Sequence, residues 1–475
     1  MPSARIPFGN LQASGLEELS GGSPVAMNVV ADSLGTVRRR PGIATWHLSV
    51  DTDGICGLHE TSDGDVYAVG NGPPSRHIYK VTTGSSLDIS NVPSGDVRGL
   101  ARPVFAETGE LLVITGGAEP EKVVKSTSIP SLLGGPPPNG SHVVSMTKRL
   151  LINDPDGTDS SLVTWSNGND STLAYGGNED WTTTLGNAVG TLPSMGKDQP
   201  ALAVHENSNE VFCFALSSVR VYAPDSTSVF VPSSSKQFGC GAPYSIVAAD
   251  QNFAWLDDRR RFVISDGRAE KIVSDPIQQT LHDMGTVSDC FGYRVVLGPL
   301  DALVWTFPTE RRTFVYQKDA GWGQWSGDGG NFLVTAKTVL RATNSVLVGT
   351  SQGHLGTLSF DAVTDLDTPI NAYVITGFLD RDTDAWKSCN RVRIAMRRGA
   401  TTTANEPYLL LSWRDGTGAW ETPLEVSLGS AGETNPVVEF WSLGVYRRRQ
   451  WKMDFREAED LTLVAVTEEF EVLAG

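Results

Sequence analysis

The chain contains a unit of four short apolar strands that recurs at a spacing of roughly 45 residues over residues 56–360. One copy consists of Tyr244–Ala249, Asn252–Leu256, Arg261–Ser265 and Glu270–Val273, separated by polar turns. Four-stranded units repeated every 40–50 residues or so are typical of a β-propeller. We therefore predict an all-β chain organised around a propeller.

The spacing predicts seven blades, although six are also compatible with the uncertain boundaries. A short helix is expected near Asp275–Met284, because Pro276 suits a first helical turn. The expected blades span residues 52–92, 96–135, 141–196, 198–240, 244–273, 278–327 and 331–361.

The pattern changes beyond residue 370, where longer strands with alternating side chains follow one another. Arg391 and Arg393 share one face of such a strand, and Trp451 and Met453 share a face of another. We predict an antiparallel β-sandwich there. The expected domains are an extended N-terminal arm with a strand pair (1–50), a β-propeller (51–362) and a C-terminal β-sandwich (370–475).

The chain is acidic, with 55 Asp and Glu against 38 Lys and Arg and a net charge of −17. A protein that grips nucleic acid by its phosphates shows the opposite sign. The charge is explained either by solubility alone or by a surface that lies near DNA without holding it. Five scattered cysteines without a Cys-x-x-Cys pair indicate reduced thiols in a protein made in the cytoplasm. The N-terminus has no signal-peptide pattern and no segment is apolar enough for a membrane helix, so we expect no membrane insertion.

No catalytic, cofactor or metal site is predicted. The segment 190–198 has one residue too many for a phosphate-binding loop, and Asp198 stands where Ser or Thr would bind Mg²⁺. The seven histidines are isolated, so we expect them at surface or edge-strand positions and not as metal ligands. Asp257 and Asp258 resemble a carboxylate pair, but a solvated hairpin tip is the simpler interpretation. Arg5-Ile6-Pro7 is similar to an element of the sialidases, whose repeated Ser-x-Asp-x-Gly-x-x-Trp turns are absent.

Three arginine triplets are the candidate interface residues. Each triplet either pairs with nearby acids such as Asp32, Asp257 or Glu439, or contacts an acidic neighbour or DNA phosphates. In an acidic chain, protein contacts are the favoured functional interpretation. The candidates are Arg38, Arg39, Arg40, Arg259, Arg260, Arg261, Arg447, Arg448 and Arg449.

Several segments, taken in order, resemble the packaged-DNA stabilisation proteins of short-tailed bacteriophages, also called tail nozzle proteins. The first lies in the N-terminal arm and includes Val25–Val30 and Arg39–Gly42. The second is Ala215–Tyr222, the third is Lys236–Ser245 followed by Phe253–Asp257 and Phe262–Gly267, and the last is Arg447–Arg456. The order and spacing of these segments carry the resemblance, which is clearest over 25–45, 210–275 and 440–475.

The resemblance implies a structural virion protein without catalytic or cofactor residues. It implies a homohexameric ring, assembled in the host cytoplasm, below the head-to-tail adaptor of a virion tail. The implied partners are the adaptor, a tail needle or plug, tail fibres or spikes, and double-stranded DNA that passes without tight binding. Acidic walls would suit that passage, because they avoid phosphate contacts with Lys and Arg that would slow ejection.

Two other functions remain open at this stage. A propeller binding module, either a protein hub or a glycan-binding protein, would hold its ligand at the central channel. A propeller hydrolase would need paired carboxylates at a defined separation, and the sequence shows no converging acids.

Overall fold

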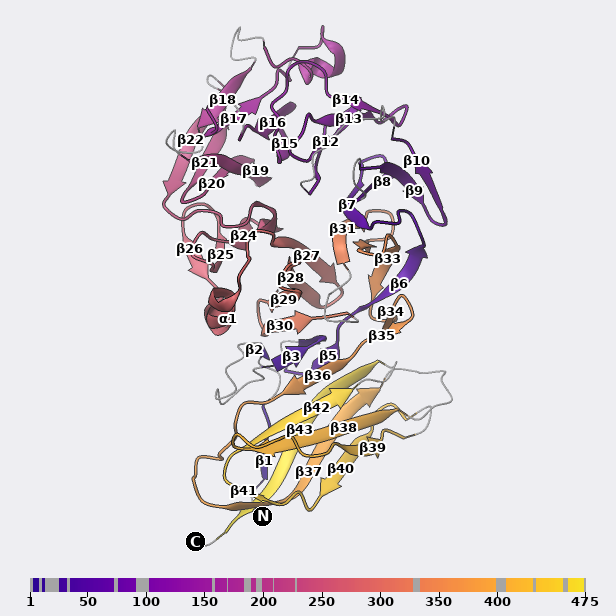
Figure 1. The fold of residues 1–475 in the computed structure, drawn as a ribbon, viewed down its shortest axis with the longest axis vertical. Helices are drawn as coiled ribbons and strands as arrows, with labels where there is room; N and C mark the ends of the chain where they lie inside the picture. Colours follow the sequence, from indigo (N-terminus) through magenta and orange to yellow (C-terminus); the bar gives the residue numbers. More distant parts are fainter. Residues whose placement is uncertain are drawn as a thin grey trace.

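The computed structural model describes residues 3–473 except for 8–10, 13–24, 32–34, 72–75, 91–101, 156–158, 169, 183–188, 194–198, 208, 227–228, 328–333, 399–406, 430–432 and 456–459. Asp32 and the end of the 190–198 segment therefore lie outside the described residues. Within them, the chain is almost entirely β-structure, arranged as a ring of blades above a second, layered domain (Figure 1). None of the described helices has the length and apolarity of a transmembrane span.

Five blades are separate four-stranded antiparallel sheets. The first comprises β7 (Ile55–Glu60), β8 (Val66–Gly70), β9 (Ile78–Thr82) and β10 (Ser85–Asp88); the second β11 (Val104–Glu107), β12 (Leu111–Thr115), β13 (Glu121–Val124) and β14 (Ile129–Leu132); the third β15 (Val143–Met146), β16 (Arg149–Asn153), β17 (Leu162–Trp165) and β18 (Gly190–Pro193); the fourth β19 (Ala201–Asn207), β20 (Glu210–Ala215), β21 (Val219–Asp225) and β22 (Val229–Lys236); the fifth β23 (Val247–Ala249), β24 (Asn252–Leu256), β25 (Phe262–Ser265) and β26 (Glu270–Ile272).

Two further blades belong to larger sheets, so that seven four-stranded units form the ring (Figure 1). The sixth comprises β27 (Phe291–Leu297), β28 (Leu300–Phe307), β29 (Arg312–Gln317) and β30 (Gly321–Trp325), and the seventh comprises β31 (Val334–Leu340), β32 (Ser345–Thr350), β33 (Leu355–Ser359) and β6 (Gly42–His47). The predicted propeller is thus confirmed. The expected helix is present as η4 (Asp275–Ile277) and α1 (Gln278–Asp283).

The second strands of the blades show why the apolar runs were so clear in the sequence. Every residue of β8, β12 and β16 is buried. These strands lie inside a stack of blades and are covered on both faces, so both sets of alternating side chains are apolar. The outermost strand β10 of the first blade is exposed along its length, and its sequence is correspondingly polar.

The ring is closed by a strand from the N-terminal arm. Strand β6 pairs antiparallel with β33, with Gly42 opposite Ser359 and Ile43 opposite Leu358. The last blade therefore takes its outer strand from a segment more than 300 residues earlier in the chain, which covers an edge that would otherwise be open to aggregation. The expected boundary at residue 50 consequently needs correction, because residues 42–47 belong to the propeller.

The C-terminal domain is a sandwich of two sheets, as expected. One sheet has the order β4-β5-β43-β37-β40, and the facing strands follow the order β3-β36-β42-β38-β39. The C-terminal strands are β36 (Ala372–Ile375), β37 (Lys387–Arg398), β38 (Tyr408–Asp415), β39 (Leu424–Ser427), β40 (Val437–Trp441), β41 (Val445–Tyr446), β42 (Arg449–Phe455) and β43 (Leu461–Val472), and the arm contributes β1 (Ser3–Arg5), β3 (Val25–Met27), β4 (Val29–Ala31) and β5 (Val37–Arg39).

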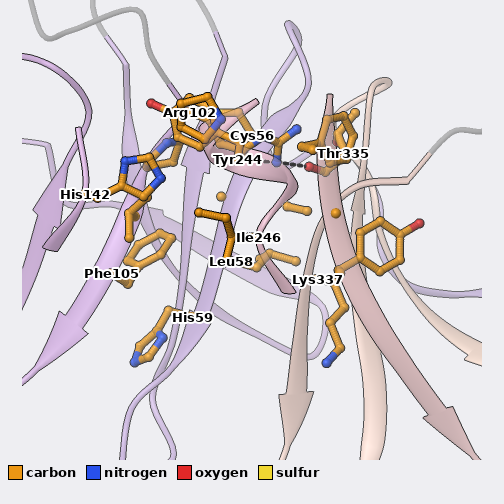
Figure 2. A pocket seen from close by; sticks show the side chains of 18 of the residues that line it. Cys56, Leu58, His59, Arg102, Phe105, His142, Tyr244, Ile246, Thr335 and Lys337 are labelled. Atoms are coloured by element: carbon orange, nitrogen blue, oxygen red, sulfur yellow. Dashed lines mark hydrogen bonds between the residues drawn. The ribbon is translucent and has the colours of Figure 1, made fainter. Parts of the chain in front are cut away.

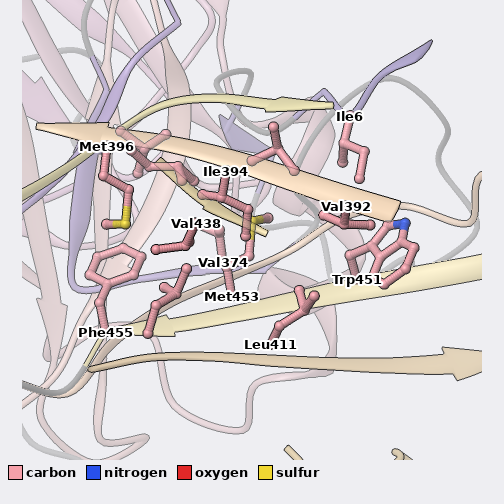
Figure 3. Packing of buried hydrophobic residues seen from close by; sticks show 14 of the residues in the cluster. Ile6, Val374, Val392, Ile394, Met396, Leu411, Val438, Trp451, Met453 and Phe455 are labelled. Atoms are coloured by element: carbon pink, nitrogen blue, oxygen red, sulfur yellow. The ribbon is translucent and has the colours of Figure 1, made fainter. Parts of the chain in front are cut away.

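The core of the sandwich is apolar and contains residues of both sheets and of the arm. Trp451 and Met453 of β42 point inward against Ile394 of β37, and Ile6 reaches the same core from the N-terminal end (Figure 3). The alternation predicted for β42 is therefore confirmed. The arm is an integral part of this domain, because its residues fill the core.

One continuous sheet links the propeller to the sandwich. Strand β3 lies between β30 of the sixth blade and β36 of the sandwich, pairing with Gln324 through Met27 and with Ile375 through Val25. The side chain of Gln317 also bonds both backbone groups of Ala31, at 3.1 and 2.8 Å. Hydrogen bonds thus run without interruption across the domain boundary.

Candidate functional site

A cavity of about 270 Å³ at the centre of the ring gathers chemically versatile side chains. Its lining comes from all seven blades, because each blade directs its innermost segment at the ring axis. One residue from each blade, in chain order, is His59, Phe105, His142, His205, Tyr244, Tyr293 and Lys337. Figure 2 shows how part of this lining converges from opposite sides of the ring.

Arg102 is the central charged group of this lining. Its guanidinium lies flat against the ring of Phe291, with 3.6 Å between Cζ and the ring centroid. Nη1 donates hydrogen bonds to the carbonyl oxygens of Cys56, at 3.1 Å, and of Thr335. Burial lowers the pKa of Arg102 to about 10, so the group is still cationic at neutral pH. Two carbonyl groups and an aromatic face therefore hold a positive charge in the middle of the propeller.

Three histidines lie in the cavity wall. His59 and His205 are on the edge strands β7 and β19, as the expected surface or edge-strand positions allow, whereas His142 is fully buried. His142 stacks on Tyr244, with centroids 4.8 Å apart, and its ring lies 5.5 Å from that of His205. His59 stacks on Phe105 at 5.4 Å. Burial lowers the pKa of all three, to about 4 for His205 and well below the usual value for His142. They are therefore neutral at pH 7 and serve as hydrogen-bonding and stacking groups.

Two tyrosines and a lysine complete the polar lining. The hydroxyl groups of Tyr244 and Tyr293 are buried and have no hydrogen-bond partner among the described residues. Burial raises the pKa of both phenols, so they remain protonated donors. Lys337 lies toward the end opposite Arg102 (Figure 2), and burial together with the charge of Arg294 lowers its pKa to about 8.

The net charge of this lining is positive, whereas the net charge of the chain as a whole is negative. The described residues around the cavity include Arg102 and Lys337 but neither Asp nor Glu, although the chain carries a net charge of −17. A pair of converging carboxylates, which a glycosidase requires, is therefore not found in this lining. No group of three or more potential metal ligands occurs among the described residues. The arrangement suits the binding of an uncharged or anionic molecule.

The first arginine triplet is mostly internal. Arg40 is fully buried and bonded to both carboxylate oxygens of Asp365, at 2.9 and 2.5 Å. Arg39 is also buried, whereas the half-buried Arg38 pairs with Asp460 at 2.9 Å. For Arg39 and Arg40 the interface prediction is wrong, because neither side chain reaches the surface of the chain.

The second triplet organises a turn. Asp257 is buried and accepts hydrogen bonds from the backbone N–H groups of Arg259 and Arg261 and from the Arg261 guanidinium. The expected solvated tip is therefore wrong for Asp257, although Asp258 is exposed. Arg260 donates to two carbonyl groups at the end of α1. Of the triplet, Arg259 alone is exposed, whereas Arg260 and Arg261 are half-buried.

The third triplet contains one internal and two external residues. Arg449 is buried and pairs with Asp415 at 2.7 Å, so it cannot serve as the predicted interface. Arg447 and Arg448 are exposed, and the Arg447 guanidinium lies 4.9 Å from the ring of Trp386. Of the nine candidates, Arg447 therefore lies beside an exposed aromatic side chain that the sequence did not single out.

An exposed apolar surface, here called the sandwich patch, comprises Trp386, Val437, Trp441, Val445 and Val472. Trp441 is 59% exposed and Trp386 48% exposed. Trp441 lies on β40, the edge strand of its sheet, with the Arg391 guanidinium 4.9 Å from its ring. Exposed tryptophans beside arginines are enriched at protein interfaces. Strand alternation could have indicated an outward Trp441, but it could not show what covers it.

No family model matches the chain, and no curated protein matches it. Among solved structures, a streptogramin B lyase is similar with 11% identity and a TM-score of 0.44 over 67% of this chain and 98% of that chain. BamB from Moraxella catarrhalis is similar with 7% identity and a TM-score of 0.41 over 75% of this chain and 96% of that chain. At such identities the likeness concerns only the propeller fold.

Proposed function

We propose that the chain is a structural subunit of a short phage tail, which assembles with copies of itself into a ring below the head-to-tail adaptor. The ring would retain packaged DNA and conduct it during ejection. The sequence resemblance to tail nozzle proteins motivates this proposal. The structural observation that supports it is the sandwich patch, because a subunit that works by assembly needs an exposed surface that can lose water on contact.

The patch has the composition of an interface core. Two large aromatic side chains each lie next to an arginine, and exposed valines are present on the neighbouring strands β40, β41 and β43. Tryptophan and arginine dominate the binding energy of interfaces, and truncating a single central residue to alanine often costs about 2 kcal/mol or more of binding free energy. The continuous sheet between the domains would keep the patch at a fixed angle to the propeller, and a ring needs such an angle to close.

The occupant we propose for the patch is a second copy of the chain. The test is mass photometry and negative-stain imaging of the purified protein, alone and mixed with its adaptor. Wild-type protein should form rings, and Trp441→Ser with Trp386→Ser should remain monomeric under the same conditions. Leu87→Ser is the matched control, since Leu87 is 64% exposed on the outer strand of a blade and should not affect assembly. Rings formed equally by the double variant would refute the proposal.

The acidic charge supports the second part of the proposal, passage of DNA without tight binding. A ring of such chains repels a duplex over roughly a Debye length, about 8 Å at physiological ionic strength. Binding of the assembled ring to duplex DNA should therefore be weaker than micromolar at moderate salt. Tighter binding with a steep dependence on salt would indicate a basic lumen and contradict this picture.

A propeller binding module is the second candidate function. The central cavity favours it, because propeller ligands bind where the blades converge, and here seven blades supply the lining. The two functions predict different behaviour of the isolated chain. A module binds its ligand as a monomer, whereas a ring subunit depends on its copies and its adaptor.

A further inference from the structure

The central cavity holds a positive charge that the protein itself does not neutralise. In the described residues, the guanidinium of Arg102 contacts two carbonyl oxygens and the face of Phe291, but no carboxylate. A buried charge without a counter-ion is costly, and buried cations are usually paired. The protein tolerates this cost at the one place where its blades converge.

Two acids line an adjoining cavity of about 380 Å³, which shares Cys56, Arg102 and Tyr244 with the central one. Asp53 and Asp289 line this second space together with Arg76. Neither carboxylate forms an ion pair with Arg102 among the described residues. On the side of the central cavity, Arg102 faces neutral groups only until Lys337 at the far end.

Several neutral groups of the lining have no hydrogen-bond partner in the described structure. They are the hydroxyls of Tyr244 and Tyr293 and Nε2 of His205, all of which are buried, whereas Nε2 of His59 lies 3.7 Å from Glu107. Leaving a buried polar atom unpaired costs roughly 1–3 kcal/mol, so three in one cavity indicate a site completed by a bound molecule. Tyr293 is itself more than nine-tenths buried, so its hydroxyl is fixed in place and does not turn toward bulk water.

We propose that the central cavity binds a small organic oxyanion, a carboxylate or a phosphate monoester, with its charged group at Arg102 and its body against the aromatic wall. Guanidinium groups bind such oxyanions by charge-assisted hydrogen bonds. The phenol hydroxyls of Tyr244 and Tyr293 are placed to donate to the ligand, and Lys337 gives a second positive charge at the opposite end. Phe105, Phe291 and the stacked histidines offer flat apolar faces for the remainder of the molecule.

Because its lining contains no carboxylate among the described residues, the cavity favours anionic ligands. In a chain of net charge −17, a carboxylate near the cavity would repel an anion strongly in this low-dielectric setting. The volume of about 270 Å³ excludes polymers and suits a compact ligand. The proposal does not depend on assembly into a ring, and the isolated chain suffices to test it.

The experiment is isothermal titration of the full-length protein with inorganic phosphate, phenyl phosphate and benzoate, at an ionic strength held constant with NaCl. We expect saturable binding of at least one organic probe, tighter than chloride or inorganic phosphate. Arg102→Gln should weaken that binding about tenfold or more, because a charge-assisted hydrogen bond is lost. Preferential binding of phenyl phosphate would identify a phosphate monoester as the ligand class, and preferential binding of benzoate would identify a carboxylate.

Two further variants keep the proposal testable if Arg102→Gln does not fold. Tyr293→Phe removes only a hydroxyl, and Lys337→Met keeps the length of the side chain while removing its charge; each should weaken binding severalfold. Arg268→Gln is the control, because Arg268 pairs with Glu210 on an outer surface. This variant should bind the probe with the affinity of the wild type. The proposal is overturned if none of the probes binds saturably at millimolar concentration, or if the cavity variants bind as well as Arg268→Gln.

Discussion

The ion pair of Arg40 with Asp365 should be the most sensitive single point of the fold. Arg40 precedes β6, and Asp365 lies in β34 (Thr364–Asp365), which pairs with β6. Arg40 also donates to Asn28 Oδ1, Pro41 O and Ser326 O at 2.9–3.0 Å. One guanidinium therefore ties the arm, the sixth blade and the closure of the ring together.

Arg40→Met removes this donor and leaves Asp365 buried without its counter-ion. Breaking a buried pair costs about 3–5 kcal/mol, and the loss of three additional bonds places the expected decrease in the free energy of unfolding in the upper half of that range. Urea unfolding followed by tryptophan fluorescence measures it, since Trp325 lies 6.0 Å from the guanidinium. Replacing Asp365 by Asn in the Arg40→Met background should restore part of the loss, because the buried charge is then removed.

Arg38→Met is the matched control. Arg38 belongs to the same triplet, but its pair with Asp460 is partly exposed, with side-chain exposures of 29% and 32%. Exposed pairs contribute about 0–1 kcal/mol, so this variant should unfold near the wild-type midpoint. Equal effects of the two substitutions, or no recovery in the double variant, would refute the view that burial makes Arg40 critical.

Three other outcomes follow from the structure. Because the folded pKa of His205 is lowered to about 4, the unfolded chain binds more protons below pH 6.5. This residue should therefore lower stability with a slope that approaches about 1.4 kcal/mol per pH unit as the pH falls from 6.5 toward 5, and His205→Gln should flatten that slope in urea titrations. Gly353→Ala should unfold the seventh blade, since its Cβ would meet Asp51 O at 1.5 Å, whereas Gly298→Ala, with open space around it, should cost only about 1 kcal/mol. Burial raises the pKa of Cys213 to about 12, so iodoacetamide at pH 8 should label it only after denaturation. Mass spectrometry measures the labelling, and a labelled Cys213 in the native protein would contradict the prediction.

The arginine triplets illustrate where sequence reasoning about sites reaches its limit. The same local pattern gave the buried Arg40, the turn-bonding Arg261 and the exposed Arg447. A run of like charges shows that the residues need partners, but burial and partner identity are set by segments far away in the chain. Asp365 is 325 residues from Arg40, and no local signal connects them.

The sequence by itself determined the strands, the blades and the division into a propeller and a sandwich. These features depend on local information, namely apolar runs, alternation at period two and turn residues. Only the tertiary structure decided that β6 closes the ring, that the arm fills the sandwich core and that His59, His142 and His205 meet in one cavity. The physical reason is that ring closure brings together residues whose separation along the chain carries no periodic signal. The chemistry of the central cavity therefore emerges only when all seven blades are in place.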